Sequence, residues 1–207
     1  MKNKNILQIV LQVVLGVVIV ILSYLLYDSL MQPIRFNSDV KYRKEFVIQR
    51  LKDIRDLEIA YKDVYGSFTG SFDTLILFYK QDSLKIIKQV GSWDDSIAVA
   101  NKQVYTDTLR IAVKDSLFRQ VKGFNIDSIR FVPFVGEQFH LESVMYQSIS
   151  NVAIPLFEAA VHNDVFLKGL DRQSVVNLND EDKNMNKYPG LKVGSVTQPN
   201  NNTGNWE

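Results

Sequence analysis

The pattern of apolar and polar positions divides the chain into three parts. From Ile6 to Tyr27 every residue is uncharged and most are aliphatic. From about Asp39 to Tyr65 apolar residues recur every three or four positions, which is the period of an amphipathic helix. After about Leu84 the apolar runs are short, rich in β-branched and aromatic residues, and partly alternating, which favours strands. Helices followed by strands predict an α+β fold with a mainly antiparallel sheet.

The uncharged segment 6–27 is long enough to be a transmembrane helix. At about 1.5 Å of rise per residue it spans a hydrocarbon core of roughly 30 Å. It has no small-x-small cleavage site, so we expect an uncleaved signal anchor of a single-pass protein rather than a removed signal peptide. The residues assigned to this anchor, with two tyrosines at its far interface, are Leu11, Val14, Gly16, Val20, Tyr24 and Tyr27.

The flanks of the anchor bear on its orientation. Lys2 and Lys4 lie in the short flank 1–5, whereas Asp28 opens the other side. Because basic residues favour the cytoplasmic side, we expect the domain in the periplasm, tethered to a bacterial inner membrane. Basic residues also follow the anchor from Arg35 onward, so a cytoplasmic domain is the alternative.

A proline separates the anchor from the amphipathic stretch. Pro33 removes a backbone donor and disfavours helix in the residue before it, so we expect residues 28–38 to form a linker. The stem helix would then begin near Asp39, with Ser38 or Asn37 as its cap. It would open an α+β domain over 39–192, followed by a flexible tail over 193–207 that lacks apolar periodicity.

The stem helix carries one apolar stripe. We expect Leu51, Ile54 and Tyr61 to pack into the domain, with a groove for a partner as the alternative use. Gly66 is predicted to stop the helix, because glycine adopts a left-handed conformation without a steric penalty. A second helix, capped by Ser71, would then fold back over the stripe.

Composition excludes several classes of function. The chain has a net charge of +1 and 23% charged residues, so no basic face for nucleic acid is expected. It has 0 cysteines, which excludes disulfides, thiolate metal sites and cysteine nucleophiles. A chain without cysteine also fits an oxidising envelope compartment.

The two histidines are the first candidates for chemistry. His140 and His162 lie in strand-like runs with Glu142 and Glu158 nearby, so paired strands could bring them together around a metal ion. Their separation and the lack of further ligand spacing favour solvated strand residues instead.

Other polar clusters lack the spacing that a catalytic motif needs. Asp94 and Asp95 are not followed by a glycine-spaced acidic loop, so a turn or a cap accounts for them better than calcium. The stretch GSFTGS lacks the Gly-Lys-Ser/Thr end of a phosphate-binding loop. We therefore assign no catalytic, cofactor-binding or metal-binding residue and expect no cofactor.

Two stretches resemble known proteins. The apolar helix, its amphipathic continuation and AYKDVYGSFTGSFDTLILF are similar to the layout of pilins and pseudopilins. The chain departs from them in having no Gly-Phe cleavage site and no acidic residue within the apolar run. The segment YPGLKVGSVTQPNNNTGNWE, with the anchor, resembles uncharacterised single-pass envelope proteins of Bacteroidota. That resemblance implies a location rather than an activity.

These observations favour a membrane-anchored, non-enzymatic structural or assembly component of a bacterial envelope complex. Its expected partners are the membrane and other envelope proteins, reached by protein–protein interaction, with self-association through the anchor left open and no nucleic acid. A membrane-tethered domain that senses a ligand or peptide is the alternative, and an anchored hydrolase is the third reading. An exposed apolar patch or an unpaired strand edge would favour assembly, and a deep pocket of converging acids would favour a hydrolase.

Overall fold

The computed structural model describes residues 2–90, 94, 100–101, 105–119, 123–148 and 151–207. They form an α+β fold with two antiparallel sheets and a very long N-terminal helix. The helical elements are α1 (Lys2–Tyr65), α2 (Phe72–Gln81), α4 (Val113–Ser116), η1 (Ile126–Ser128), α5 (Asn163–Phe166) and α6 (Arg172–Asn184). The strands are β1 (Ser83–Val90), β2 (Tyr105–Ala112), β3 (His140–Gln147), β4 (Ala153–His162) and β5 (Gly190–Gly194).

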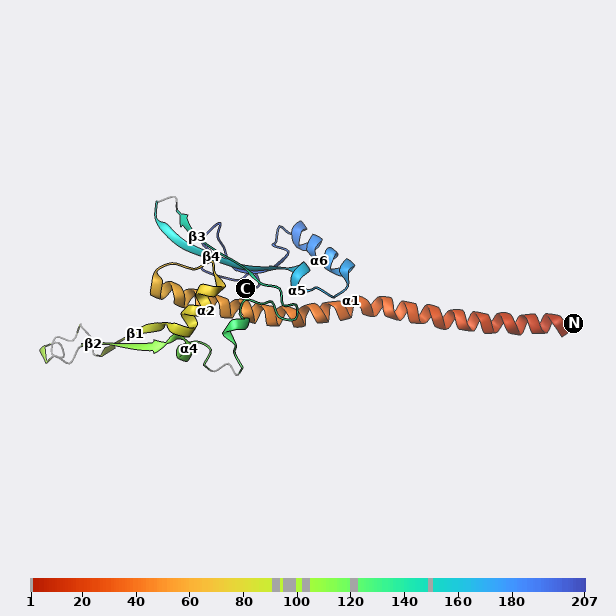
Figure 1. The fold of residues 1–207 in the computed structure, drawn as a ribbon. Coiled ribbons are helices and arrows are strands. Elements are labelled where there is room, and N and C mark those ends of the chain that lie inside the picture. The colour runs from red at the N-terminus through yellow and green to blue at the C-terminus, as the bar shows by residue number, and fades with distance from the viewer. Residues whose placement is uncertain (1, 91–93, 95–99, 102–104, 120–122, 149–150) are drawn as a thin grey trace.

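Helix α1 runs without interruption from the apolar segment into the domain (Figure 1). Its 64 residues correspond to about 96 Å at 1.5 Å per residue. The prediction of a linker over 28–38, with a new helix capped at Ser38 or Asn37, is therefore wrong. The first described residue of α1 that the domain buries is Val40.

The helix continues through Pro33 because a break there would cost more than the proline does. A proline inside a helix forfeits one backbone hydrogen bond and costs about 3 kcal/mol. Ending one helix and starting another would leave up to four carbonyls and four N–H groups without helical partners. The carbonyl that Pro33 leaves unpaired is that of Ser29, four residues earlier, and Ser29 is exposed, so water can reach it.

The larger sheet has the order β3-β4-β5, with β4 in the centre. Its outer edge at β5 is covered by the C-terminal residues: Gly194 donates to the carbonyl of Thr203 (3.1 Å), and Asn205 donates to that of Lys192 (3.0 Å). Trp206 packs against the core, and the Glu207 carboxylate lies 2.7 Å from the Arg55 guanidinium. The prediction of a loose tail over 193–207 is wrong, because residues 193–194 belong to β5 and Thr203 and Asn205 pair with that strand.

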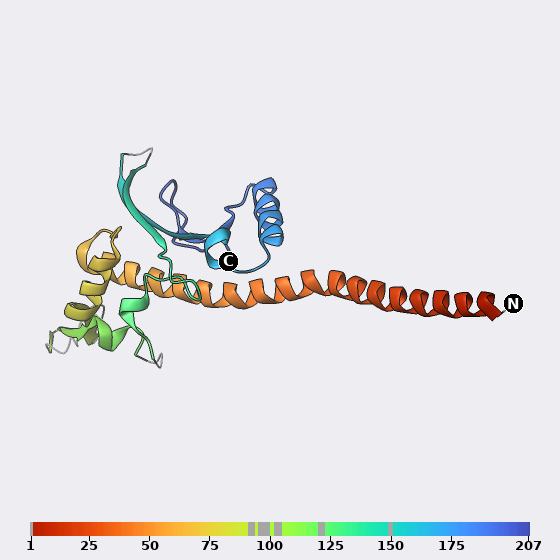
Figure 2. The ribbon, with the colours of Figure 1, turned by 45° about the vertical axis from the view of Figure 1, so that its right-hand side comes forward.

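Helix α1 passes through the middle of the domain. The three-stranded sheet lies on one side of it, and α2 and the β1–β2 pair lie on the other (Figures 1 and 2). The apolar stripe of α1 is therefore enclosed from both sides. The same core cluster also contains Leu75, Phe78, Ile129, Phe157, Val161 and Val193.

Strands β1 and β2 form a separate two-stranded ribbon. It projects from the end of the domain that lies farthest from the N-terminus (Figure 1). The pairing is antiparallel, with Ile86 opposite Leu109 and Ser83 opposite Ala112. In the described part of the chain neither strand has a second neighbour, so each keeps one unpaired edge.

Candidate functional site

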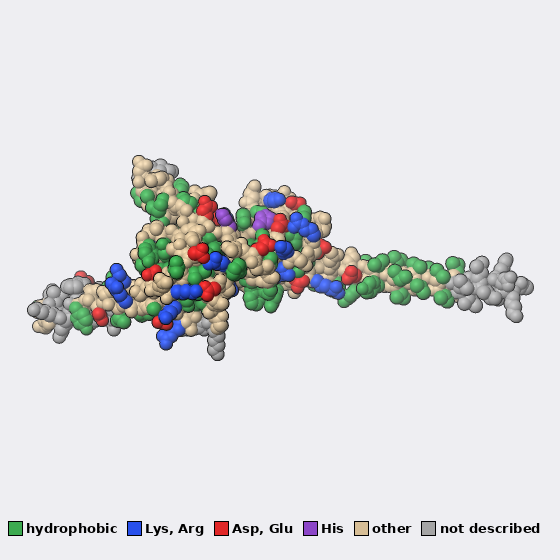
Figure 3. Space-filling model, viewed as in Figure 1, with side chains coloured by type: hydrophobic (Ala, Val, Ile, Leu, Met, Phe, Trp, Pro, Cys, Tyr) green, Lys and Arg blue, Asp and Glu red, His purple; other side chains and the backbone are tan. Residues whose placement is uncertain are grey.

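The residues that the sequence assigns to the anchor lie on the part of α1 that leaves the domain. Leu11, Val14, Val20, Tyr24 and Tyr27 are all exposed. A Cβ at Gly16 would meet nothing within 4 Å. Figure 3 shows a nearly continuous hydrophobic surface along this part of the helix, with charged side chains gathered over the domain. The helix is long and apolar enough to cross a membrane, and the domain buries none of its most apolar stretch.

The stem residues lie in the domain core. Leu51 and Ile54 are fully buried, and Tyr61 is half-buried with its ring 5.3 Å from that of Phe78. The stripe is thus used for packing rather than for a partner.

The helix ends where the sequence places its stop. Gly66 follows Tyr65 with a φ of +79°, and its N–H donates to the carbonyl of Lys62 (2.7 Å). The next residues turn back across the stem, and α2 begins at Phe72.

A buried carboxylate lies beside this turn. Glu58 is fully buried, and its Oε2 accepts a hydrogen bond from the backbone N–H of Thr69 (3.0 Å). Its Oε1 has no partner among the described residues. Burial raises the pKa of Glu58 to about 8, and the hydrogen bond from Thr69 opposes this only in part. Glu58 was not among the predicted site residues, although it follows Ile54 by four residues on the buried stripe.

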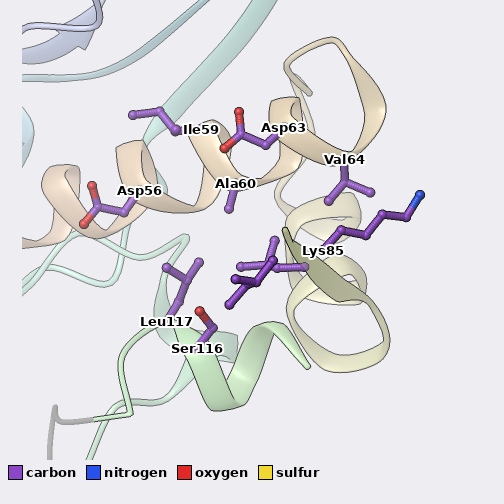
Figure 4. A pocket seen from close by; sticks show the side chains of 10 residues that line it. Asp56, Ile59, Ala60, Asp63, Val64, Lys85, Ser116 and Leu117 are labelled. Atoms are coloured by element: carbon purple, nitrogen blue, oxygen red, sulfur yellow. The ribbon is translucent and has the colours of Figure 1, made fainter. Parts of the chain in front are cut away.

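One functional candidate on the domain is a groove between α1, β1 and the end of α4 (Figure 4). Its volume is about 450 Å³. Ala60 and Val64 of α1 point toward β1 and Leu117, whereas Asp56 and Asp63 lie along the rim. The full lining is Asp56, Ile59, Ala60, Asp63, Val64, Leu84, Lys85, Ile86, Ser116 and Leu117.

A second hollow continues this groove along α1. It shares Asp56, Ser116 and Leu117 with the first and adds Asp53 and Asp115, together with Gln49, Phe118 and Arg119. Asp53 accepts a hydrogen bond from Gln49 (3.0 Å). Burial is the main cause that raises the pKa of Asp53 and of Asp56, although nearby arginines oppose it. The two hollows together form an acidic trough with an apolar floor.

The β1–β2 ribbon exposes large apolar side chains. Ile87 is 70% exposed, and Tyr105, Leu109 and Ile86 are exposed as well. An isolated two-stranded ribbon gains little stability in water, so apolar side chains on it are a cost unless another surface covers them.

A smaller aromatic cluster lies on the domain near the apolar end of α1. Tyr42, Phe46 and Phe134 are exposed and lie within 5.7 Å of one another by ring centroids. The Arg43 guanidinium lies 5.8 Å from the Phe134 ring and donates to the carbonyl of Phe166 (3.0 Å). This arginine ties α1 to the rest of the domain.

The histidines are not gathered into one centre. Strands β3 and β4 do pair, with His140 opposite Ala160, two residues short of His162. His140 lies 3.5 Å from Glu142, and His162 accepts a hydrogen bond from the N–H of Asp164 (3.2 Å). Among the described residues no group of three or more His, Asp or Glu could hold a metal ion.

Of the acidic pair Asp94 and Asp95, the structure describes only the first. Asp94 is an exposed turn residue, and Asp95 lies outside the described residues.

Comparison with known proteins gives no relative. No family model matches this chain, and no curated protein or solved structure matches it either.

Proposed function

We propose that this chain is a membrane-anchored, non-enzymatic structural or assembly component of a bacterial envelope complex. One observation carries the proposal: the helix that offers a long uncharged segment is also the central core element of the domain. A core helix of a soluble protein would hide its apolar residues. The most apolar stretch of α1 is not buried by the domain at all.

The anchor in this proposal is the transmembrane segment 6–27, in a single pass with the domain in the periplasm. About 20 Å of helix would then separate Tyr27 from Val40, the first buried residue, at 1.5 Å per residue. Because α1 is continuous, the domain would be carried as a rigid body and its ribbon would face away from the membrane. The exposed ribbon is the surface on which we expect another envelope protein to bind.

The absence of cysteine makes the anchor directly testable. Lys183→Cys on α6 and Asn3→Cys in the N-terminal flank each create the only thiol of the chain. A membrane-impermeant maleimide added to spheroplasts should label the Lys183→Cys protein and spare the Asn3→Cys protein until lysis. The reverse pattern would place the domain in the cytoplasm, and equal labelling of both would mean that α1 does not cross the membrane.

Assembly is tested by placing a photo-crosslinking residue on the ribbon. At Ile87 it should give discrete heterologous adducts in native membranes. At Met185, another exposed apolar position directly after α6, it should give none, because this end of α6 is not on the proposed surface. Adducts of equal yield at both positions would contradict a specific role for the ribbon.

A further inference from the structure

The groove beside α1 has an open strand edge as one of its walls. β1 contributes three successive residues to its lining, Leu84 to Ile86, whereas β2 contributes none. In the described part of the chain β1 is hydrogen-bonded only to β2. The unpaired edge of β1 therefore faces the groove, where its N–H and C=O groups could pair with an added extended segment.

Such a segment would bury apolar surface that the floor of the groove now exposes to water. Ile59 is 37% exposed, Val64 39% and Ile86 43%. They come from two separate elements that face one another across the hollow. Alternate side chains of an extended segment point to the same face, so its apolar residues can occupy this floor at every second position.

The charge of the trough indicates which residues should alternate with the apolar ones in the segment. Four carboxylates line it, from Asp53, Asp56, Asp63 and Asp115, against the cations Lys85 and Arg119. No hydrogen bond or ion pair joins Asp56 or Asp63 to another described residue. Arg50 also acts on Asp53, and Arg55 and Lys52 act on Asp56, but the lining itself holds more carboxylates than cations. An acidic lining around an apolar floor favours an occupant that brings positive charge.

We propose that this groove binds an extended segment of a partner protein in which apolar and basic residues alternate, added as a strand to the free edge of β1. Backbone pairing to β1 would supply register, the apolar residues would cover the floor, and the basic residues would face Asp56 and Asp63. The identity of the segment as part of an envelope protein rests on the proposed function. The binding chemistry does not.

The test uses the full chain in detergent micelles and three synthetic octapeptides. One alternates valine and lysine, the second alternates valine and glutamate, and the third is the valine–lysine peptide with alternate backbone amides methylated. Calorimetric titration should show the first peptide binding at least tenfold more tightly than either of the others. The second peptide isolates charge, and the third isolates backbone pairing.

Two double variants locate the site. Asp56→Asn with Asp63→Asn should weaken binding of the valine–lysine peptide at least fivefold. Asp180→Asn with Glu181→Gln removes two exposed carboxylates from α6 and should leave binding unchanged. Both variants should keep the wild-type melting temperature, which separates lost binding from lost folding.

Several results would overturn the proposal. It fails if the methylated peptide binds as well as the unmodified one, if the α6 variant weakens binding as much as the groove variant, or if no peptide binds at millimolar concentration. It fails equally if crosslinking shows that the chain forms a dimer through β1 of two copies, because a second copy then fills the groove. Membrane labelling is measured separately, so an anchored chain that binds no peptide refutes the groove alone.

Discussion

The buried carboxylate of Glu58 makes the stability of the fold depend on pH, and the variant Glu58→Gln should lack this dependence. In the fold its pKa is about 8, compared with 4.5 as the ordinary value for glutamate. The folded chain therefore holds a proton that the unfolded chain releases between these pH values. This stabilisation is fully present below pH 4.5 and is lost as the pH rises toward 8.

The size of the effect follows from the two pKa values. Each pH unit of difference is worth about 1.4 kcal/mol, which gives a loss of about 3–4 kcal/mol between pH 5 and pH 8. In Glu58→Gln the amide oxygen can still accept the hydrogen bond from Thr69, and no charge forms at either pH. The variant should therefore match the wild type within about 1 kcal/mol at pH 5 and exceed it by several kcal/mol at pH 8.

The assay is chemical denaturation of the full chain in detergent micelles, followed by circular dichroism at both pH values. Glu45→Gln, an exposed position on the same helix, is the control and should change stability by less than about 0.5 kcal/mol at either pH. If Glu58→Gln and the wild type lose the same stability between pH 5 and pH 8, Glu58 is not the cause of the pH dependence.

Three further predictions concern the packing of the domain. Ile54→Asp should place an unpaired charge in the core and cost more than about 3 kcal/mol by thermal melting, whereas Leu77→Asp, at a position 55% exposed, should cost less than about 1. Gly66→Val should cost about 1–2 kcal/mol because of its φ of +79°, whereas Gly66→Asn should cost clearly less; equal costs would mean that φ is not the cause. Deleting residues 203–207 should uncover the edge of β5 and lower the melting temperature by several degrees, whereas Glu207→Gln should cost under about 1 kcal/mol.

Local signals were enough for much of the fold. The three- and four-residue spacing of Leu51 and Ile54 identifies the buried face of α1, and Gly66 has the left-handed conformation that its position suggests. The change from helical to alternating period predicts that strands follow the helices, and the two sheets are antiparallel. These features depend on residues close together in the chain, so one sequence carries them.

Features that depend on competing or distant interactions could not be predicted. Pro33 disfavours helix locally, but the helix on both sides of it outweighs the one lost hydrogen bond. The tail after Gly194 is held by backbone hydrogen bonds between β5 and Thr203 and Asn205. Such bonds require no periodic pattern of apolar side chains, so the sequence gives no sign of them. The groove joins α1 to β1, and only the tertiary fold brings Asp56 near Ile86.

The proposed membrane anchoring depends most on α1 being one rigid helix that passes from the membrane into the domain. Spin labels at Tyr24→Cys and Glu45→Cys lie on either side of Pro33 in a chain with 0 cysteines of its own. At 1.5 Å per residue their backbones should be about 32 Å apart, so double electron–electron resonance in lipid nanodiscs should give one narrow distribution near that value. A broad distribution, a markedly shorter distance, or a chain that does not enter the nanodiscs would contradict a continuous membrane stem.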